Sequence, residues 1–468
     1  MTLNRSEFAD KRIAILGMAR TGMAAAPVLR ALGARVLLSD MESSAKLGPK
    51  VAEAWTLGVD VRTSATPEEA LGDSETVVPS PGIPRDAPIL QLARLRGMSI
   101  LSEIEVAYRI AKAPILAVTG TNGKTTTTML LGEIMRLAGR GTWVAGNIAA
   151  DEVKQSLITA ASQADEDDVI VAEISSFQLE WVEQFRPKVG VLTNITPDHL
   201  NRHRTFAEYA GCKERLFAAQ RPDDVAVINA VNAPARAIGG RLRSRLFWFD
   251  RGNCGGADSA CVCGGRILLR WCGEEHVLCR VDELRIPGMH NLENALAAAG
   301  AAIAYGIEPE VVAEALRAFT GVVHRMEPIA TVGGVLYVNN SMCTNVDAAI
   351  RSLEAMGRPT VLIAGGADKN SDFAPLGQAI ARSAKHLVLI GQAAPLLESA
   401  ARDAGFEAIS HADSMESAVR IATARAAPGD AVMLSPACAS FDMFTDFEAR
   451  GEAFRQAVRE LDGEGQAA

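Results

Sequence analysis

A lysine and a run of threonines follow a glycine turn in the segment Ile115 to Thr128, which reads ILAVTGTNGKTTTT. An apolar β-branched run precedes the turn and a helix-compatible run follows it, so the order is strand, loop, helix. Backbone N–H groups of such a loop, together with the positive end of a helix dipole, can surround a polyphosphate. Lys124 would then reach the terminal phosphates, and the Thr125 hydroxyl would bind Mg²⁺. The predicted phosphate-binding residues are Gly120, Thr121, Asn122, Gly123, Lys124, Thr125 and Thr126.

The loop departs from the usual phosphate-loop pattern at one position. Val118 lies five residues before Gly123, where that pattern has a glycine. An ordinary strand-to-helix turn that happens to contain glycines is the alternative. A Gly-Lys-Thr triplet directly between a strand pattern and a helix pattern is uncommon by accident, which favours the phosphate site.

Acidic and imidazole side chains follow two further apolar runs. Glu173 comes directly after the run VIVA, and Asp198 and His199 are predicted to end the next strand. Parallel α/β sheets place their ligands at the carboxyl ends of strands. Glu173 is therefore the candidate acid that positions Mg²⁺ beside Lys124 and Thr125. For His199, the pattern favours a structural role and a ligand role equally.

The N-terminal segment contains a second glycine turn. Residues 17–22, GMARTG, form a GxAxxG version of the dinucleotide loop, and Asp40 follows the second predicted strand at the distance of a ribose-binding acid. A nicotinamide dehydrogenase would use such a loop. The same turn cradles any nucleoside diphosphate, however, and a dehydrogenase leaves Lys124 and Glu173 without a purpose.

Alternating strand and helix patterns run along 468 residues, a length too great for one core, and predict an α/β fold of three domains. The expected domains are 1–103, Rossmann-like; 104–322, a central phosphate-loop domain with a mainly parallel sheet; and 323–468, again Rossmann-like. Asn291 and Asn294 lie at the start of a helical run. We expect one of them to be its N-cap, and either could hydrogen-bond a base or a ribose.

Composition excludes several classes of partner. The net charge of -9 and a pI near 5.5 argue against nucleic acid or an anionic membrane surface as the main partner. The first residues lack the apolar run of a signal peptide, and no apolar stretch approaches the roughly 20 residues that span a bilayer. We therefore expect a cytoplasmic protein.

Five of the eight cysteines gather in one stretch that is rich in glycine and in short strand patterns. Their spacing matches no C-x-x-C pair, so free thiols on a β-hairpin insertion are favoured over a zinc site. The five are Cys254, Cys261, Cys263, Cys272 and Cys279.

Nine motifs in a fixed order carry a family resemblance over essentially the whole chain, which resembles the Mur ligases of peptidoglycan synthesis. The resemblance implies an ATP-dependent amide ligase that adds D-glutamate to UDP-N-acetylmuramoyl-L-alanine through an acyl phosphate. It also implies a monomer with small-molecule substrates and no nucleic acid or membrane partner. The motifs are TGTNGKTT, GNI, EISSFQLE, NITPDHLNRH, YAGCK, GMHNLENALAA, GVVHRME, GGADKNSDF and LSPACASFDMFTDFEARG.

The resemblance also implies site residues. Two Mg²⁺ sites would be formed by Thr125, Glu173, His199 and Lys213, and the family lysine at the position of Lys213 is carbamylated, which turns a cation into an oxygen ligand. The implied catalytic residues are Lys124, Glu173, His199 and Lys213. Further ATP contacts would come from Asn291, Asn294, Arg325 and Asn340. UDP-substrate contacts would come from Thr21, Asp40, Ser80, Pro81, Gly82, Asn147 and Gln178, and amino-acid contacts from Thr344, Lys369, Ser440 and Phe447.

One segment departs from the family pattern. The family usually has Asp-Ser-Lys-Ala-Thr-Asn where this chain has residues 340–345, NSMCTN. Asn340 can still hydrogen-bond a ribose hydroxyl, but Met342 cannot supply the positive charge of the lysine. Two alternatives follow from this change: the same ligase chemistry with a different amino acid, such as L-glutamate, or a catalytically weak paralogue that binds nucleotide.

Overall fold

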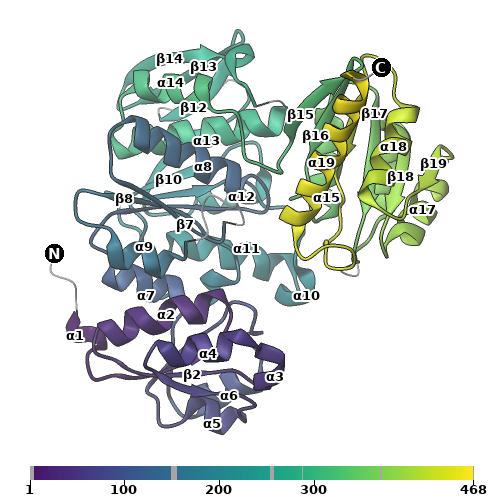
Figure 1. Cartoon of the computed structure of the whole chain (residues 1–468). Coiled ribbons are helices and arrows are strands. Elements are labelled where there is room, and N and C mark those ends of the chain that lie inside the picture. Colours follow the sequence, from purple (N-terminus) through teal and green to yellow (C-terminus); the bar gives the residue numbers. More distant parts are fainter. Residues whose placement is uncertain (1–4, 149–154, 253–257, 287, 369–370, 467–468) are drawn as a thin grey trace. The chain divides into compact units, whose positions relative to one another are not determined.

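The computed structural model describes residues 5–148, 155–252, 258–286, 288–368 and 371–466. Its contacts divide the chain into two compact units (Figure 1). The first unit contains Met1–Leu284 and Glu293–Phe319, and the second contains Arg285–Leu292 and Thr320–Ala468. Three separate sheets lie in these units, two in the first and one in the second, as the three-domain α/β prediction requires. No helix of the described residues is both long enough and apolar enough to cross a membrane.

The N-terminal sheet has five parallel strands in the order β3-β2-β1-β4-β5. Alternate residues of β1 face opposite sides: Ile13 and Ile15 pack with helix α2, and Ala14 and Leu16 pack with α5 and α6. Apolar residues on both faces produce the doubly wound arrangement that the sequence predicts. The strands are β1 (Arg12–Leu16), β2 (Arg35–Ser39), β3 (Asp60–Arg62), β4 (Thr76–Pro79) and β5 (Ser99–Ile100); the helices are α1 (Arg5–Phe8), α2 (Arg20–Ala31), α3 (Ser44–Leu47), α4 (Pro49–Thr56), α5 (Pro67–Leu71) and α6 (Pro88–Leu95).

The central sheet has nine strands in the order β14-β13-β12-β11-β10-β9-β6-β8-β7. All five residues of β6 are buried, which explains its uninterrupted apolar sequence. Its register pairs Val118 with Glu173 on β8, and Glu173 in turn pairs with Gly146 on β7. Three strand ends therefore meet at one edge of the sheet. The strands are β6 (Ile115–Thr119), β7 (Thr142–Gly146), β8 (Val169–Glu173), β9 (Val189–Leu192), β10 (Val225–Asn229), β11 (Arg245–Phe249), β12 (Ser259–Cys263), β13 (Arg266–Trp271) and β14 (Glu274–Arg280).

Helices and short 3-10 turns surround this sheet. The helices of the central region are α7 (Glu103–Ile110), α8 (Lys124–Leu137), α9 (Leu157–Gln163), α10 (Leu200–His203), α11 (Phe206–Glu214), α12 (Ala233–Gly239), α13 (Met289–Tyr305) and α14 (Pro309–Ala318), and the 3-10 turns are η1 (Gln178–Trp181), η2 (Arg215–Phe217) and η3 (Val281–Glu283).

The cysteine-rich stretch forms the antiparallel edge β12-β13-β14, so the predicted hairpin insertion is present. Cys261 and Cys279 are buried, whereas Cys263 and Cys272 are exposed. Cys254 lies outside the described residues. Across the ranges that the structure describes, no three His, Cys, Asp or Glu side chains gather as a metal site.

The C-terminal sheet has the order β15-β16-β20-β17-β18-β19, with only β15 antiparallel. Helices α15, α16 and α17 pack in one apolar cluster, and α18 and α19 pack in the other, so this sheet is also doubly wound. The strands are β15 (Glu327–Val332), β16 (Val335–Asn339), β17 (Thr360–Gly365), β18 (Ala384–Ile390), β19 (Ile409–His411) and β20 (Ala431–Leu434); the helices are α15 (Val346–Ala355), α16 (Ala374–Ser383), α17 (Ala394–Asp403), α18 (Met415–Arg425) and α19 (Phe447–Gln466).

Candidate active site

The loop between β6 and α8 has the conformation of a phosphate cradle. Gly120 and Gly123 have φ angles of 150° and 84°, which glycine tolerates and other residues rarely adopt. A Cβ on Gly120 would lie 1.9 Å from Thr193 Oγ1, and one on Gly123 would lie 2.2 Å from Asn294 Oδ1. Gly123 is the N-cap of α8, so the first N–H groups of that helix open toward the loop.

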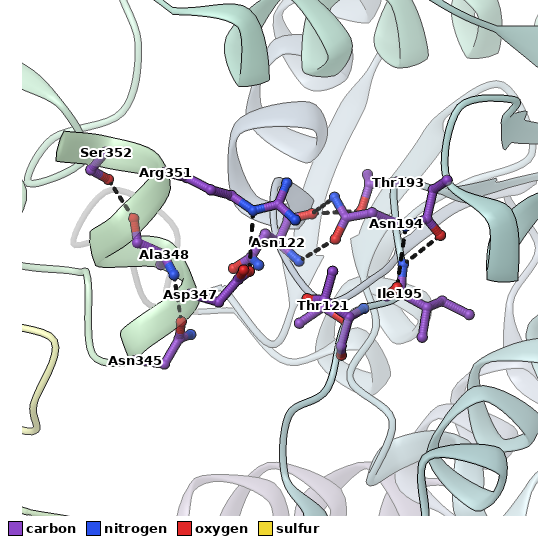
Figure 2. Close-up of polar contacts among 12 residues, drawn as sticks. Thr121, Asn122, Thr193, Asn194, Ile195, Asn345, Asp347, Ala348, Arg351 and Ser352 are labelled. Atoms are coloured by element: carbon purple, nitrogen blue, oxygen red, sulfur yellow. Dashed lines mark hydrogen bonds and ion pairs between the residues drawn. The ribbon is translucent and has the colours of Figure 1, made fainter. Parts of the chain in front are cut away.

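The segment that follows β9 holds this loop in place (Figure 2). Asn194 accepts a hydrogen bond from the Asn122 N–H through Oδ1 (3.0 Å) and donates one to the Asn122 carbonyl through Nδ2 (3.0 Å). Thr193 Oγ1 donates to the same carbonyl over 2.6 Å. These contacts set the loop conformation before any ligand binds.

Oxygen atoms that could ligate a divalent cation lie where the loop joins α8. Thr125 Oγ1 donates to Glu173 Oε2 over 2.7 Å, and both side chains are buried. Asn147 Nδ2 reaches Glu173 Oε1 at 3.4 Å. Lys124 Nζ donates to the Thr121 carbonyl over 2.8 Å. The structure thus brings together the predicted lysine, threonine and glutamate of the phosphate site.

Lys213 is buried behind the same loop. Its side chain extends from α11, and Nζ donates to the Gly120 carbonyl over 2.6 Å. Burial, and then the nearby charge of Lys124, hold the pKa of Lys213 well below its ordinary range. The Lys213 ammonium also lies 4.7 Å from the centre of the Tyr209 ring. Lys213 therefore lies on the inner face of α11, beside the phosphate loop.

His199 does not end a strand, contrary to the sequence-based placement. Strand β9 ends at Leu192, because the chain then leaves the sheet to bond the phosphate loop. His199 precedes α10 with a φ of 52°. Its ring forms an edge contact with Phe177 (4.9 Å between centres), and Nε2 lies 3.7 Å from Asp198 Oδ2. The side chain is half-exposed and lies close to the phosphate site through packing rather than through strand position.

The helix α13 begins earlier than the sequence suggests, so neither Asn291 nor Asn294 is its N-cap. The helix starts at Met289, which places Asn291 in its first turn. Asn294 instead points at the phosphate loop, where Thr127 Oγ1 donates to Asn294 Oδ1 over 3.4 Å. Gly288, with a φ of 94°, provides the sharp turn before the helix.

The predicted UDP-substrate residues of the N-terminal domain lie around one edge of its sheet. Ser80 directly follows β4, and its Cβ lies 3.0 Å from the position of a Cβ on Gly17. Asp40 follows β2; its Oδ2 accepts the Met18 N–H (2.8 Å) and its Oδ1 accepts the Glu42 N–H (2.9 Å). The Asp40 carboxylate therefore shapes the glycine turn itself. Thr21 lies in the first turn of α2.

Arg202, which sequence reasoning missed, joins the loop after β4 to the central domain. Nη1 donates to the Gly82 carbonyl (3.2 Å), and Nη2 donates to those of Pro81 (3.2 Å) and Ile83 (2.7 Å). Nε and Nη2 also bind the buried Glu180 carboxylate at 2.9 and 2.7 Å. One guanidinium thus orders three consecutive backbone carbonyls beside two predicted substrate residues. The surrounding sequence, HLNRHR, contains no pattern that predicts this contact between Arg202 and the loop.

Gln178 lies on η1, which also carries Glu180, and it stabilises its own turn. Its Oε1 accepts hydrogen bonds from the Ser175 N–H (2.9 Å) and the Ser175 hydroxyl (3.0 Å). Asn147 is anchored in the same way, because its N–H donates to the Glu173 carbonyl over 2.8 Å. Both predicted substrate residues therefore lie on ordered turns at the end of β7 and β8.

In the second unit, Asn340 is buried and its amide is engaged inside the domain. Nδ2 donates to Ser352 Oγ (2.8 Å) and Ser435 Oγ (3.0 Å), and Oδ1 accepts the Met326 N–H (3.1 Å). This geometry favours a structural role over the expected ribose contact. Asn345 caps α15 by accepting the Ala348 N–H over 2.8 Å (Figure 2).

Arg450, a second residue that sequence reasoning did not single out, bonds segments that carry three of the predicted amino-acid residues. Arg450 is buried and donates to the hydroxyl and carbonyl of Ser341 at 3.0 and 2.8 Å, and to the carbonyls of Cys438 and Ala439 at 3.1 Å each. Ser341 Oγ in turn donates to the Phe447 carbonyl over 2.7 Å. Burial lowers the pKa of Arg450 to about 10.

These contacts tie together the segments that carry Thr344, Ser440 and Phe447. Arg325, also predicted to contact ATP, extends from the same unit, and its Nη1 lies 3.8 Å from Met342 Sδ. Lys369, the fourth predicted amino-acid residue, lies outside the described residues.

Comparison with known proteins places this geometry in a family. Three family models match in chain order: Mur ligase MurD-like, N-terminal domain (residues 11–102); Mur ligase middle domain (118–302); and Mur ligase, glutamate ligase domain (324–438). A protein of Pelotomaculum thermopropionicum is 46% identical over 97% of this chain and 99% of its own length. The chain belongs to the Mur ligase family. A protein of Caldanaerobacter subterraneus subsp. tengcongensis is 44% identical over the same shares, and both relatives are named UDP-N-acetylmuramoylalanine–D-glutamate ligase.

Solved structures of other Mur ligases share the fold. A pseudomurein peptide ligase type C from Methanothermus fervidus and the UDP-N-acetylmuramate-alanine ligase MurC from Thermotoga maritima each superpose with a TM-score of 0.59. Each covers 97% of this chain and 99% of its own, at 18% sequence identity. At that identity the likeness concerns the fold, and it matches the three-domain α/β architecture of this Mur ligase.

Proposed function

We propose that this Mur ligase adds D-glutamate to UDP-N-acetylmuramoyl-L-alanine in an ATP-dependent step of peptidoglycan precursor synthesis. The observation that carries the proposal is the similarity to relatives of that name at 46% and 44% identity over 97% of the chain. The match of residues 324–438 to a glutamate ligase domain agrees with the choice of amino acid. The ordered loop between β6 and α8 supports ATP as the second substrate.

The oxygen donors at the phosphate loop fit Mg²⁺, a hard cation that prefers oxygen ligands. Thr125 and Glu173 would hold one ion, since their oxygens lie 2.7 Å apart in a buried position. His199 and Lys213 would belong to a second site. Bound there, Mg²⁺ would neutralise charge on the phosphate oxygens.

Lys213 suits carbamylation. Carbon dioxide adds to the neutral amine, and the new N–C bond forms as a proton leaves; the buried Lys213 has a lowered pKa that favours the neutral form. The product is a carboxylate, which can ligate a cation. Labelling with ¹³C-bicarbonate tests this: the wild-type protein should show a carbamate carbon resonance that Lys213→Met lacks, and its absence from the wild type would refute the modification.

The reaction requires two bond exchanges. The substrate carboxylate attacks the γ-phosphorus of ATP and ADP departs with the electron pair of the broken bond. The amine of D-glutamate then attacks the acyl carbon, inorganic phosphate leaves, and the nitrogen loses a proton. Lys124 and the first N–H groups of α8 stabilise negative charge on the phosphates, and the glycine loop orients them. Most of the catalysis therefore comes from positioning and electrostatics.

The remaining assignments are proposals that rest on the family resemblance. Domain boundaries lie near residues 103 and 322, and the protein acts as a cytoplasmic monomer on small-molecule substrates. The UDP-substrate contacts are Thr21, Asp40, Ser80, Pro81, Gly82, Asn147 and Gln178; the amino-acid contacts are Thr344, Lys369, Ser440 and Phe447; the further ATP contacts are Asn291, Asn294 and Arg325.

Phosphate release from ATP by the purified protein tests the activity directly. The reaction contains UDP-N-acetylmuramoyl-L-alanine, Mg²⁺ and bicarbonate, and D-glutamate, L-glutamate or another amino acid is added in turn. We expect release that depends on both the UDP-substrate and D-glutamate. Release with another amino acid would retain the ligase and assign the change in specificity to Met342 and its neighbours. No release with nucleotide still bound would favour the weak paralogue.

A further inference from the structure

A cavity of about 510 Å³ lies in the first unit on the outer side of α11. Its volume lies within the range of roughly 300–1,000 Å³ that is usual for small-molecule sites. The lining comes from the segment before α6, from α6 itself, and from η1, α10, α11 and η2. Five arginines contribute to it: Arg85, Arg94, Arg202, Arg204 and Arg215.

The cavity is separate from the phosphate loop, because the two sites use different faces of α11. Glu208 and Cys212 line the cavity, and these positions recur with helical spacing. Tyr209 and Lys213, one position further along, face the phosphate loop: the Tyr209 hydroxyl lies 3.0 Å from Thr121 Oγ1, and Lys213 Nζ bonds the Gly120 carbonyl. A ligand in the cavity therefore would not occupy the nucleotide site.

The cavity is positively charged in a protein whose net charge is -9. Its five arginines exceed its three acidic residues by two. Arg202 binds the Glu180 carboxylate and Arg204 binds Asp86, so two of the acids are already neutralised. The excess positive charge therefore comes from Arg85, Arg94 and Arg215.

Two of these arginines are held by an aromatic ring instead of a carboxylate. The guanidinium carbons of Arg85 and Arg94 lie 5.3 and 4.8 Å from the centre of the Trp181 ring. Neither forms an ion pair with a carboxylate of the described residues. Stacking on an aromatic face fixes the plane of a guanidinium and leaves its edge available for hydrogen bonds. Arg215 contributes a third guanidinium, bonded to the Glu180 carbonyl over 2.5 Å.

We propose that this cavity binds a small ligand that carries two or more phosphate groups. The planar fork of a guanidinium matches phosphate oxygens bidentately, and three forks on different elements require more than one anionic group. Because the Trp181 ring is covered by arginines, the phosphates rather than a base would be recognised. The site does not depend on the ligase activity, and it lies on the other face of α11 from the phosphate loop.

Equilibrium dialysis with labelled inorganic pyrophosphate tests the proposal on the full-length chain. All proteins carry Lys124→Ala, which weakens binding at the phosphate loop. We expect Arg85→Gln/Arg94→Gln to weaken pyrophosphate binding at one site at least about tenfold, since charge-assisted hydrogen bonds are lost. Arg382→Gln is the matched control, because Arg382 is exposed and lies 3.7 Å from its partner Glu354; it should bind like the parent.

Trp181 fluorescence provides a second measurement at the same place. Pyrophosphate should change the emission of the parent protein, and the change should disappear in Arg85→Gln/Arg94→Gln and in Trp181→Phe. Thermal unfolding of each variant verifies that it is folded. Displacement of pyrophosphate by ADP or by inorganic triphosphate would identify a nucleotide or a free polyphosphate as the better occupant, and either supports the site. Unchanged affinity and stoichiometry after loss of both arginines would overturn it.

Discussion

Replacing Arg202 should weaken binding of the UDP-substrate far more than binding of ATP. Its guanidinium orders the carbonyls of Pro81, Gly82 and Ile83, beside the proposed substrate contacts, and rests on the Phe177 ring at 5.0 Å. Hydrogen bonds from a charged donor contribute about 1.5–3 kcal/mol each. If binding of the UDP-substrate loses the free energy of only one such hydrogen bond, KM for the UDP-substrate should rise about 10- to 100-fold in Arg202→Met. KM for ATP should change less than about twofold.

Stability must be separated from positioning, because Arg202→Met also leaves Glu180 without its partner. The Glu180 side chain is buried, with 3% of its surface exposed. Breaking such a pair from one side destabilises by about 3–5 kcal/mol, whereas replacing both partners with apolar residues is often neutral. Arg202→Met/Glu180→Met should therefore regain the thermal midpoint while KM for the UDP-substrate stays high, since the loop carbonyls remain without their donor.

Steady-state kinetics with each substrate varied in turn, together with calorimetric binding of the UDP-substrate without ATP, measure this effect. Arg204→Gln is the control, because Arg204 is exposed and its pair with Asp86 lies at the surface, where an ion pair contributes about 0–1 kcal/mol. Wild-type affinity of the folded double variant for the UDP-substrate would show that Arg202 is purely structural. Inactivity of the wild type would instead count against the proposed function.

Two further predictions concern a backbone position and a buried acid. Gly123→Ala should weaken nucleotide binding at least about tenfold by calorimetry, because its φ of 84° strains an L-residue and its Cβ would meet Asn294 Oδ1 at 2.2 Å; Gly240→Ala, with no contact under 3.7 Å, should bind normally. Glu103 is buried, which raises its pKa from 4.5 to about 7. Between pH 4.5 and 7, Glu103 therefore stays protonated in the folded state but ionises in the unfolded state. The free energy of unfolding falls as pH rises through this range. Glu103→Gln should raise the free energy of unfolding at pH 8 by roughly 3 kcal/mol, and the thermal midpoint with it, and should have little effect at pH 4.5. An equal change at both pH values would refute this assignment.

Local patterns in the chain predict most of the architecture. Strands such as ILAVT and VIVAE are predicted correctly because a strand buried on both faces needs an uninterrupted apolar sequence. The phosphate loop is also readable, since Gly120 and Gly123 adopt φ angles that favour glycine. The contact between Thr125 and Glu173 follows from parallel topology, which brings strand ends to one edge of the sheet.

Errors occur where a distant segment competes with a local pattern. His199 is misplaced because residues after Leu192 leave the sheet to bond Asn122, an interaction invisible in local periodicity. The prediction that an asparagine is the N-cap of α13 is wrong, because the turn at Gly288 starts the helix earlier, at Met289. Asn340 donates to the hydroxyls of Ser352 and Ser435, partners more than ten residues away in sequence that local periodicity does not indicate.

The amino-acid sequence by itself determined the fold class, the three-domain order, the phosphate loop and the family. Only the tertiary structure decided the roles of Arg202 and Arg450, the separation of the two faces of α11, and the cavity beside Trp181. The physical reason is the separation along the chain between the groups that interact. Backbone conformation and burial follow from neighbours in the chain, whereas the partner of a long charged side chain is chosen by whichever carbonyls, carboxylates or rings the fold brings within reach.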